Sequence, residues 1–197
     1  MLITMPAAPV PAKVEWSFDQ PVQVNRSEFT GKRRATILSA APRWYAAVTL
    51  PAIIGEDGVL DWRAFVVDCD GVANSFRVIA CERDQMGGNP NVVVSGANQG
   101  GHALATAGWG DPGPKLKRGQ FVTIGDQLVM LMAPVIADAN GRATLNFKAY
   151  LRLSPADGAQ IEVRRPYAVM SMSDPKNGWI VDVGQNYAVT FPCEESF

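Results

Sequence analysis

The feature that most constrains the fold is the recurrence of apolar side chains at every second position in two early segments. In Val14-Glu15-Trp16-Ser17-Phe18, and again from Arg43 to Leu50, every second side chain is apolar. A period of two places these side chains on one face of a strand, which is typical of half-buried antiparallel sheets. Further strands are expected at 74–81, 167–172, 179–183 and 187–191. The sequence therefore predicts a mainly β protein.

The hydrophobic period changes to that of a helix in one segment. Residues 60–69 are predicted to form a helix that packs Trp62 and Phe65 on the sheet. Asp57 or Asp61 is expected to cap its start, because a carboxylate there accepts hydrogen bonds from the first free amides. The residues at helical spacing are Leu60, Ala64 and Val67, with Phe65 adjoining.

Glycine is concentrated between residues 87 and 114, which favours loops or a long hairpin over packed structure. We therefore expect an antiparallel β-sandwich with one helix, formed by residues 13–82 and 167–197. A small β-rich, barrel-like insertion at 83–166 interrupts it. The proline-containing residues 1–12 are predicted to be an extended arm, lying across a neighbouring subunit or disordered. If the arm lies across a neighbour, deleting it should weaken assembly more than folding.

The strongest hairpin signal is Asn140-Gly141, which suggests a type I′ turn with φ above zero at both central residues. Asp138-Ala139-Asn140-Gly141 superficially resembles a calcium loop. Residues 146–150 hold no carboxylate that could act as the later bidentate ligand, so a turn is the better interpretation.

Composition and charge exclude several classes of protein. The formal net charge of −1 gives no general attraction to nucleic acid, and Lys32-Arg33-Arg34 is interpreted as a solvated strand start. The three cysteines are an odd number without a CxxC pair, which argues against a disulfide framework and a zinc site. No apolar run approaches the length of a membrane helix, and residues 1–6 are not expected to act as a signal peptide, because they lack a basic start and a long apolar run.

No group of residues forms a recognisable reaction centre. His102 is the sole histidine, in a glycine-rich segment, and is interpreted as a surface residue. The glycines are not followed by Lys-Ser or Lys-Thr, so they do not indicate a phosphate loop. We predict no catalytic, metal-binding or cofactor-binding residue. Trp109, between two glycines, has little core to join and is predicted to be a possible interface residue.

Nine short motifs follow one another in an order that carries more information than any of them alone. Taken together, they resemble the minor tail proteins of long, flexible-tailed bacteriophages, in particular the distal tail protein. The resemblance spans roughly residues 40–190. In chain order the motifs are Arg43-Trp44-Tyr45, Trp62-x-x-Phe65, Gly71, Phe76, Gly108-Trp109, Leu116-Lys117-Arg118-Gly119, Ala137-Asp138-Ala139-Asn140-Gly141, Leu151-Arg152 and Pro155-Ala156-Asp157-Gly158.

This resemblance implies a structural protein without catalytic residues, a metal or a cofactor. Its β-sandwich would form the wall of a ring, commonly a hexamer, that joins the tail tube to the baseplate hub. The expected partners are other copies of the chain, the tail tube protein, the baseplate hub and other minor tail proteins. Neither nucleic acid nor a membrane is required. The protein would be made in the cytoplasm of a bacterial host and reside in the tail tip of the virion.

Two other functions remain open from the sequence. One is a carbohydrate- or receptor-binding β-module, belonging to a virion or a secreted complex, that uses Trp109 and the glycine-rich residues around it. The other is a hydrolase of unrecognised type, which the single histidine and the lack of a paired nucleophile argue against.

Overall fold

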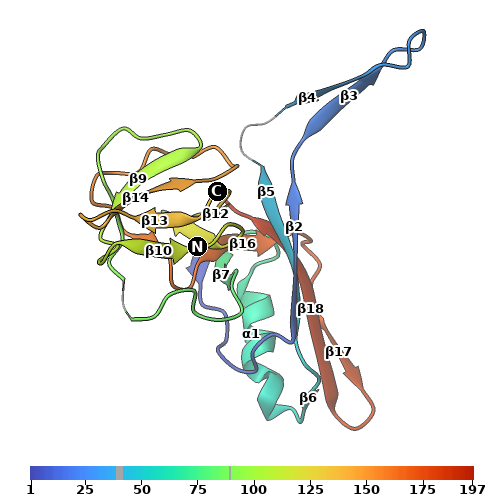
Figure 1. Ribbon diagram of the computed structural model, residues 1–197. Coiled ribbons are helices and arrows are strands. Elements are labelled where there is room, and N and C mark those ends of the chain that lie inside the picture. Colours follow the sequence, from blue (N-terminus) through green and yellow to red (C-terminus); the bar gives the residue numbers. More distant parts are fainter. Residues whose placement is uncertain (39–41, 89) are drawn as a thin grey trace. The chain divides into compact units, whose positions relative to one another are not determined.

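The computed structural model describes residues 1–38, 42–88 and 90–197 (Figure 1). The predicted mainly β fold is confirmed: 44% of residues lie in strands and 6% are helical, with one α-helix among the described residues. Residues 39–41 and 89, which the predicted domains include, lie outside the described residues.

The chain folds into two compact units. The first contains residues 1–18, 43–78 and 169–197, and the second contains residues 19–42 and 79–168. The insertion predicted at 83–166 therefore corresponds to most of the second unit. The structure differs in grouping 19–42, which the sequence assigned to the sandwich, with this second unit.

The first unit is built on a sheet in which β18 is the central strand. The strand order is β1-β7-β16-β18-β5-β2, and β17 and β6 also pair with β18. Because β18 is ten residues long, it pairs with β17 and β6 near its start and with β16 and β5 near its end. The strands are β1 (Leu2–Ile3), β2 (Lys13–Asp19), β5 (Arg43–Thr49), β6 (Ile53–Ile54), β7 (Ser75–Ile79), β16 (Tyr167–Met172), β17 (Trp179–Asp182) and β18 (Asn186–Glu195).

Helix α1 (Leu60–Asp68) packs on this sheet through an aromatic cluster. Phe65 of the helix lies 5.1 Å from Phe76 of β7 and 5.8 Å from Phe191 of β18, ring centre to ring centre. Trp62 lies 6.4 Å from Phe191. Edge-to-face and tilted contacts at such distances add to the gain from burial itself. The predicted packing of Trp62 and Phe65 on the sheet is confirmed, and Figure 1 shows α1 beside the strands of this unit.

Two details of the helix prediction are wrong. The helix is preceded by a 3₁₀ turn, η1 (Asp57–Val59), and Val59 occupies the N-cap position without a side-chain hydrogen bond. No aspartate caps the helix, because the 3₁₀ turn leads the chain into it. The expected apolar face is also rotated, since Leu60 and Val67 are exposed. The large aromatic side chains occupy the buried face instead.

The N-terminal arm packs on the first unit itself. Leu2 and Ile3 form β1, which pairs in parallel with Ser75 and Phe76 of β7 at one end of the sheet order. The indole N–H of Trp62 donates to the carbonyl oxygen of Ala8 at 3.1 Å. The prediction of an arm that is disordered or lies across a neighbour is therefore wrong. Its prolines permit edge pairing, because only two residues need to join the ladder.

The second unit has small sheets around its own hydrophobic core. Two isolated bridges, Val93 to Gln160 and Leu131 to Phe147, connect the sheets β14-β9-β8 and β12-β11-β15. The remaining pairs are β10-β13 and β3-β4. The strands are β3 (Val22–Arg26), β4 (Arg33–Ile37), β8 (Val93–Val94), β9 (Ala103–Ala107), β10 (Gly113–Leu116), β11 (Phe121–Ile124), β12 (Gln127–Met130), β13 (Val135–Ala137), β14 (Arg142–Asn146) and β15 (Ile161–Glu162).

The glycine-rich segment contributes to this core, so the expectation of unpacked loops is wrong. Val92, Val94, Leu104 and Trp109 are all buried within it. Gly108 shows why glycine is needed, since its φ is +88° and an added Cβ would lie 2.1 Å from the carbonyl oxygen of Asn91. These glycines therefore permit close approaches between backbone segments.

The turn at Asn140-Gly141 exists, but it is not the predicted type I′. The N–H of Gly141 donates to the carbonyl of Asp138 at 3.1 Å, and Gly141 has φ of +67°. Asn140 does not have positive φ, which a type I′ turn would require. The arrangement is a type I turn followed by a left-handed glycine, which is common in three-residue hairpin loops.

Deletion of residues 1–12 should destabilise the protein itself. The buried indole N–H of Trp62 would lose its acceptor, which costs about 1–3 kcal/mol, and β1 would be lost from the sheet. Urea unfolding at low protein concentration measures the effect. The Trp62→Phe variant is the control. In this background the deletion should lower the free energy of unfolding by less, because phenylalanine has no N–H that needs the carbonyl of Ala8 as acceptor. An unchanged unfolding free energy would contradict the assignment of the arm to its own subunit.

Candidate functional site

Trp109, which was predicted from the sequence to be a possible interface residue, lies in the core of the second unit. It is 3% exposed, and its indole N–H donates to Thr106 Oγ1 at 2.7 Å. The Thr106 hydroxyl in turn donates to the carbonyl oxygen of Ala143 at 2.7 Å. The premise that Trp109 has little core to join is therefore wrong. The neighbouring glycines allow the backbone to bring this side chain inward, and it presents no free ring face to a partner.

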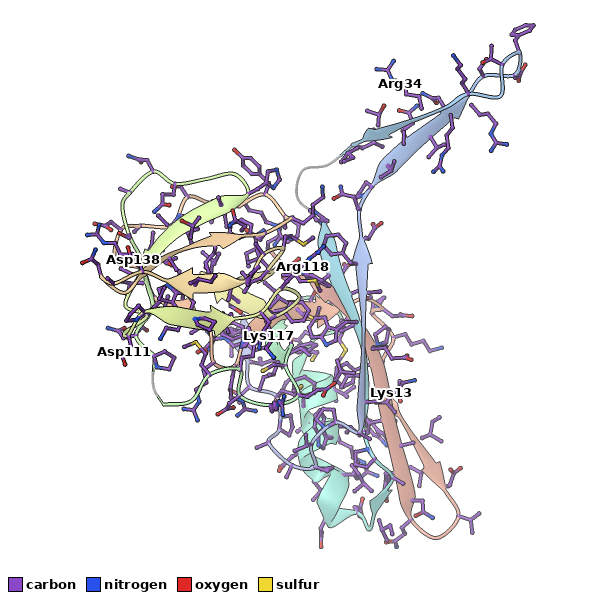
Figure 2. All side chains as sticks on the ribbon, in the orientation of Figure 1. Lys13, Arg34, Asp111, Lys117, Arg118 and Asp138 are labelled. Atoms are coloured by element: carbon purple, nitrogen blue, oxygen red, sulfur yellow. The ribbon has the colours of Figure 1, made fainter. Side chains whose placement is uncertain are left out.

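The other candidate residues are dispersed. His102 is exposed, as predicted, and its ring contacts the ring of Tyr150 edge-to-face at 5.5 Å. Within the described residues, no group of three or more His, Cys, Asp or Glu side chains is placed to hold a metal ion. Asp138, labelled in Figure 2, accepts backbone N–H bonds from Arg142 and Asn140, both at 2.8 Å. These bonds lower the pKa of Asp138, so its carboxylate is ionised and stabilises the turn.

The cysteines are not arranged as reactive thiolates. Burial raises the pKa of Cys69 to about 11, with Asp68 and Asp70 adding to the shift. Burial also raises the pKa of Cys193 to about 12. Both therefore remain neutral thiols near pH 7, and the nucleophilic form of cysteine is the thiolate.

The residues of the Leu116–Gly119 motif have packing and turn functions. Leu116 is buried. The backbone N–H of Lys117, labelled with Arg118 in Figure 2, donates to the side-chain oxygen of Gln120 at 2.6 Å. Gly119 has φ of +89°, and its N–H donates to Leu131 O at 2.8 Å. These contacts connect β10 to β11 without creating a site.

The most unusual surface in the chain is the hairpin of β3 and β4, residues 22–37, which we call the basic hairpin. Every residue of both five-residue strands is exposed. Its loop is closed by the N–H of Ser27, which donates to the carbonyl of Lys32 at 2.9 Å, and by Gly31, whose φ is +65°. Isolated two-stranded hairpins are at best marginally stable in water. Such a surface is typical of a segment that a partner covers.

The basic hairpin has one apolar and one polar face. Its register places Val22 opposite Ile37 and Val24 opposite Ala35, so these four side chains share a face, which ends near the loop in the pair Arg26 and Arg33. The opposite face carries Gln23, Asn25, Arg34 and Thr36. On the apolar face Val24 is 48% and Ile37 is 56% exposed, and Phe29 in the loop is 99% exposed.

The basic hairpin also carries a concentrated positive charge. Figure 2 labels Arg34 on β4, where side chains project from both sides of the ribbon. The predicted solvated strand start at Lys32-Arg33-Arg34 is confirmed, because β4 begins at Arg33 and is exposed. The hairpin itself was not predicted, although apolar residues at every second position, Val22 with Val24 and Ala35 with Ile37, were a usable signal in the sequence.

A second exposed apolar segment lies in the first unit, at β17 and the loop that follows it. Ile180 is 63%, Val181 52% and Val183 98% exposed. The guanidinium of Arg63 on α1 lies 5.3 Å from the ring centre of Trp179 and 4.9 Å from that of Tyr187. This cation–π contact holds β17 against the helix side of the sheet.

Comparison with known proteins adds no family to this description. No protein-family model matches the sequence, and no curated protein matches it. No helix in the described part of the chain combines the length and apolar character needed to cross a bilayer.

Substitution of Trp109 should act on stability. Trp109→Ala is expected to lower the free energy of unfolding by about 3–5 kcal/mol, because it opens a cavity and leaves the Thr106 hydroxyl without its donor. Chemical denaturation measures this change. Tyr150→Ala, at a half-exposed aromatic residue of the same unit, is the control and should cost much less. A Trp109→Ala protein of unchanged stability would contradict the core assignment.

Proposed function

We propose that this protein is a structural subunit of a bacteriophage tail tip, a distal tail protein that forms a ring between the tail tube and the baseplate hub. The observation that carries the proposal is the basic hairpin, an amphipathic strand pair whose residues are all exposed. A monomer gains nothing by exposing Val22, Val24, Ile37 and Phe29 together. A subunit that assembles with its neighbours covers such a surface.

The distribution of charge supports association between copies. Residues 1–18, 43–78 and 169–197 carry ten Asp and Glu but five Lys and Arg. The basic hairpin, residues 22–37, carries four Lys and Arg and one Glu. A positive surface on one copy and a negative surface on another form a heterologous contact, which closes into a ring when the rotation between copies permits.

The location in a phage tail and the expected partners are inferred from the sequence resemblance. These partners are the tail tube protein, the baseplate hub and other minor tail proteins. The alternative of a carbohydrate-binding module has lost the residue on which it was based, because Trp109 is buried.

Changes to the apolar face of the basic hairpin should prevent self-association. We expect the Val24→Ser and Ile37→Ser double variant to weaken it at least about tenfold, because each buried side chain of this size is worth about 1.5–3 kcal/mol. Light scattering across a range of concentrations measures the mass, and electron microscopy shows whether the particles are rings.

The matched control is the Gln23→Ser and Thr36→Ser double variant, which alters the same two strands on the polar face. It should assemble nearly as the unmodified protein does. A protein that stays monomeric at all concentrations and also fails to bind the end of a purified tail tube would contradict the proposed function.

A further inference from the structure

We propose that β4 of one copy pairs antiparallel with the free edge of β17 of the next copy, with Arg34 opposite Asp182 and Ile37 opposite Trp179. This inference rests on the proposed function, because it names the contact by which copies of the chain would join. Among the described residues, β4 pairs only with β3 and β17 only with β18, so each has one edge without a strand partner. Such edges offer unpaired N–H and C=O groups that another strand can satisfy.

The two edges match in length and in the pattern of their faces. β4 has five residues and β17 has four. On β17, Trp179 lies opposite Val189 and Val181 lies opposite Tyr187, so both share a face with these buried residues of β18. The partly exposed apolar side of β17 is therefore continuous with the helix-covered side of the sheet.

Joining the strands in the proposed register extends this apolar side across four strands. One row reads Val22, Ile37, Trp179 and Val189, and every member is apolar. The next row reads Val24, Ala35, Val181 and Tyr187. The third pair on this face of the hairpin, Arg26 and Arg33, lies beyond the end of β17, so the apolar part of the joined face has two rows. The apolar faces of the basic hairpin and of β17 thus become one surface.

The opposite face of the joined sheet provides the charge pair. Its rows read Gln23, Thr36, Ile180 and Ala188, then Asn25, Arg34, Asp182 and Asn186. Arg34 faces Asp182 in the second row, and directly opposed opposite charges stabilise a strand pair.

Other registers of the same two strands lose these matches. A slip by one residue would set Arg34 against Val181 on the apolar face, because such a slip turns every side chain to the other side. Pairing β3 instead of β4 in a similar position would place Gln23 opposite Asp182 and provide no ion pair. A slip by two residues would keep the faces but set Thr36 or Lys32 opposite Asp182, and Arg34 would lose its partner. The proposed register is the one that pairs Arg34 with Asp182 and Ile37 with Trp179 together.

The first test is a charge exchange measured by light scattering. Arg34→Asp or Asp182→Arg alone should weaken self-association at least about tenfold, and combining them should restore it to within about threefold. The matched control is Lys32→Asp, which makes the same change of charge in the loop of the hairpin. Asp182→Arg should not rescue it. Equal rescue of both variants would overturn the proposed register.

The second test is a cross-link between two different chains. Thr36→Cys in one chain and Ile180→Cys in another, both also carrying Cys81→Ser, should form a linked dimer under mild oxidation when mixed. Neither chain alone should do so, and Val181→Cys in place of Ile180→Cys should react less because its side chain lies on the other face. Rings that form without this link or charge rescue would overturn the strand pairing and leave the ring proposal intact. The absence of any self-association would overturn the strand pairing, and it would overturn the proposed function as well if the protein also failed to bind the end of a purified tail tube.

Discussion

Phe191 holds the first unit together, because it lies where helix, sheet and aromatic cluster meet. Its ring contacts Trp62 and Phe65 of α1 and Phe76 of β7. The strand that carries it, β18, pairs with four other strands along its ten residues. The position of β17, and therefore of the surface that it exposes, follows from this strand. Loss of the aromatic cluster would destabilise the sheet that positions β17, although none of the residues in the proposed contact would change.

Much of the first unit was predictable, because its side chains obey simple periods. The alternation from Arg43 to Leu50 placed Trp44, Ala46 and Val48 on a buried face, and the structure confirms it. The bounds of the helix also followed from its period. The packing of Trp62 and Phe65 on the sheet was predicted as well, but the face through Leu60 and Val67 was wrongly expected to be buried, because the spacing of aliphatic residues gives no weight to where the aromatic rings of the sheet lie. Tertiary contacts with Phe76 and Phe191 decided that Trp62 and Phe65 face inward.

The second unit was harder to predict, because its glycines have a tertiary function that sequence cannot show. A high glycine content usually indicates loops, yet Gly108 lets the backbone just after β9 approach the backbone of Asn91 closely. That approach places Trp109 in the core, where Thr106 satisfies its N–H. The prediction that Trp109 is a possible interface residue was therefore wrong for a physical reason. The flexibility that glycine confers in an unfolded chain says little about packing once it meets its neighbours.

The basic hairpin was overlooked because its individual signals are weak, yet its physics is the most informative about assembly. Its strands alternate and so define two faces, as a strand of the core does. Both strands are exposed throughout, so the hairpin itself does not cover its apolar face. A strand pair with a defined apolar face has a specified register wherever that face becomes buried. Docking would therefore stabilise the hairpin and fix the geometry between copies in the same step. Closure of a ring requires that geometry, since a contact of variable register would give rings of variable size or open chains.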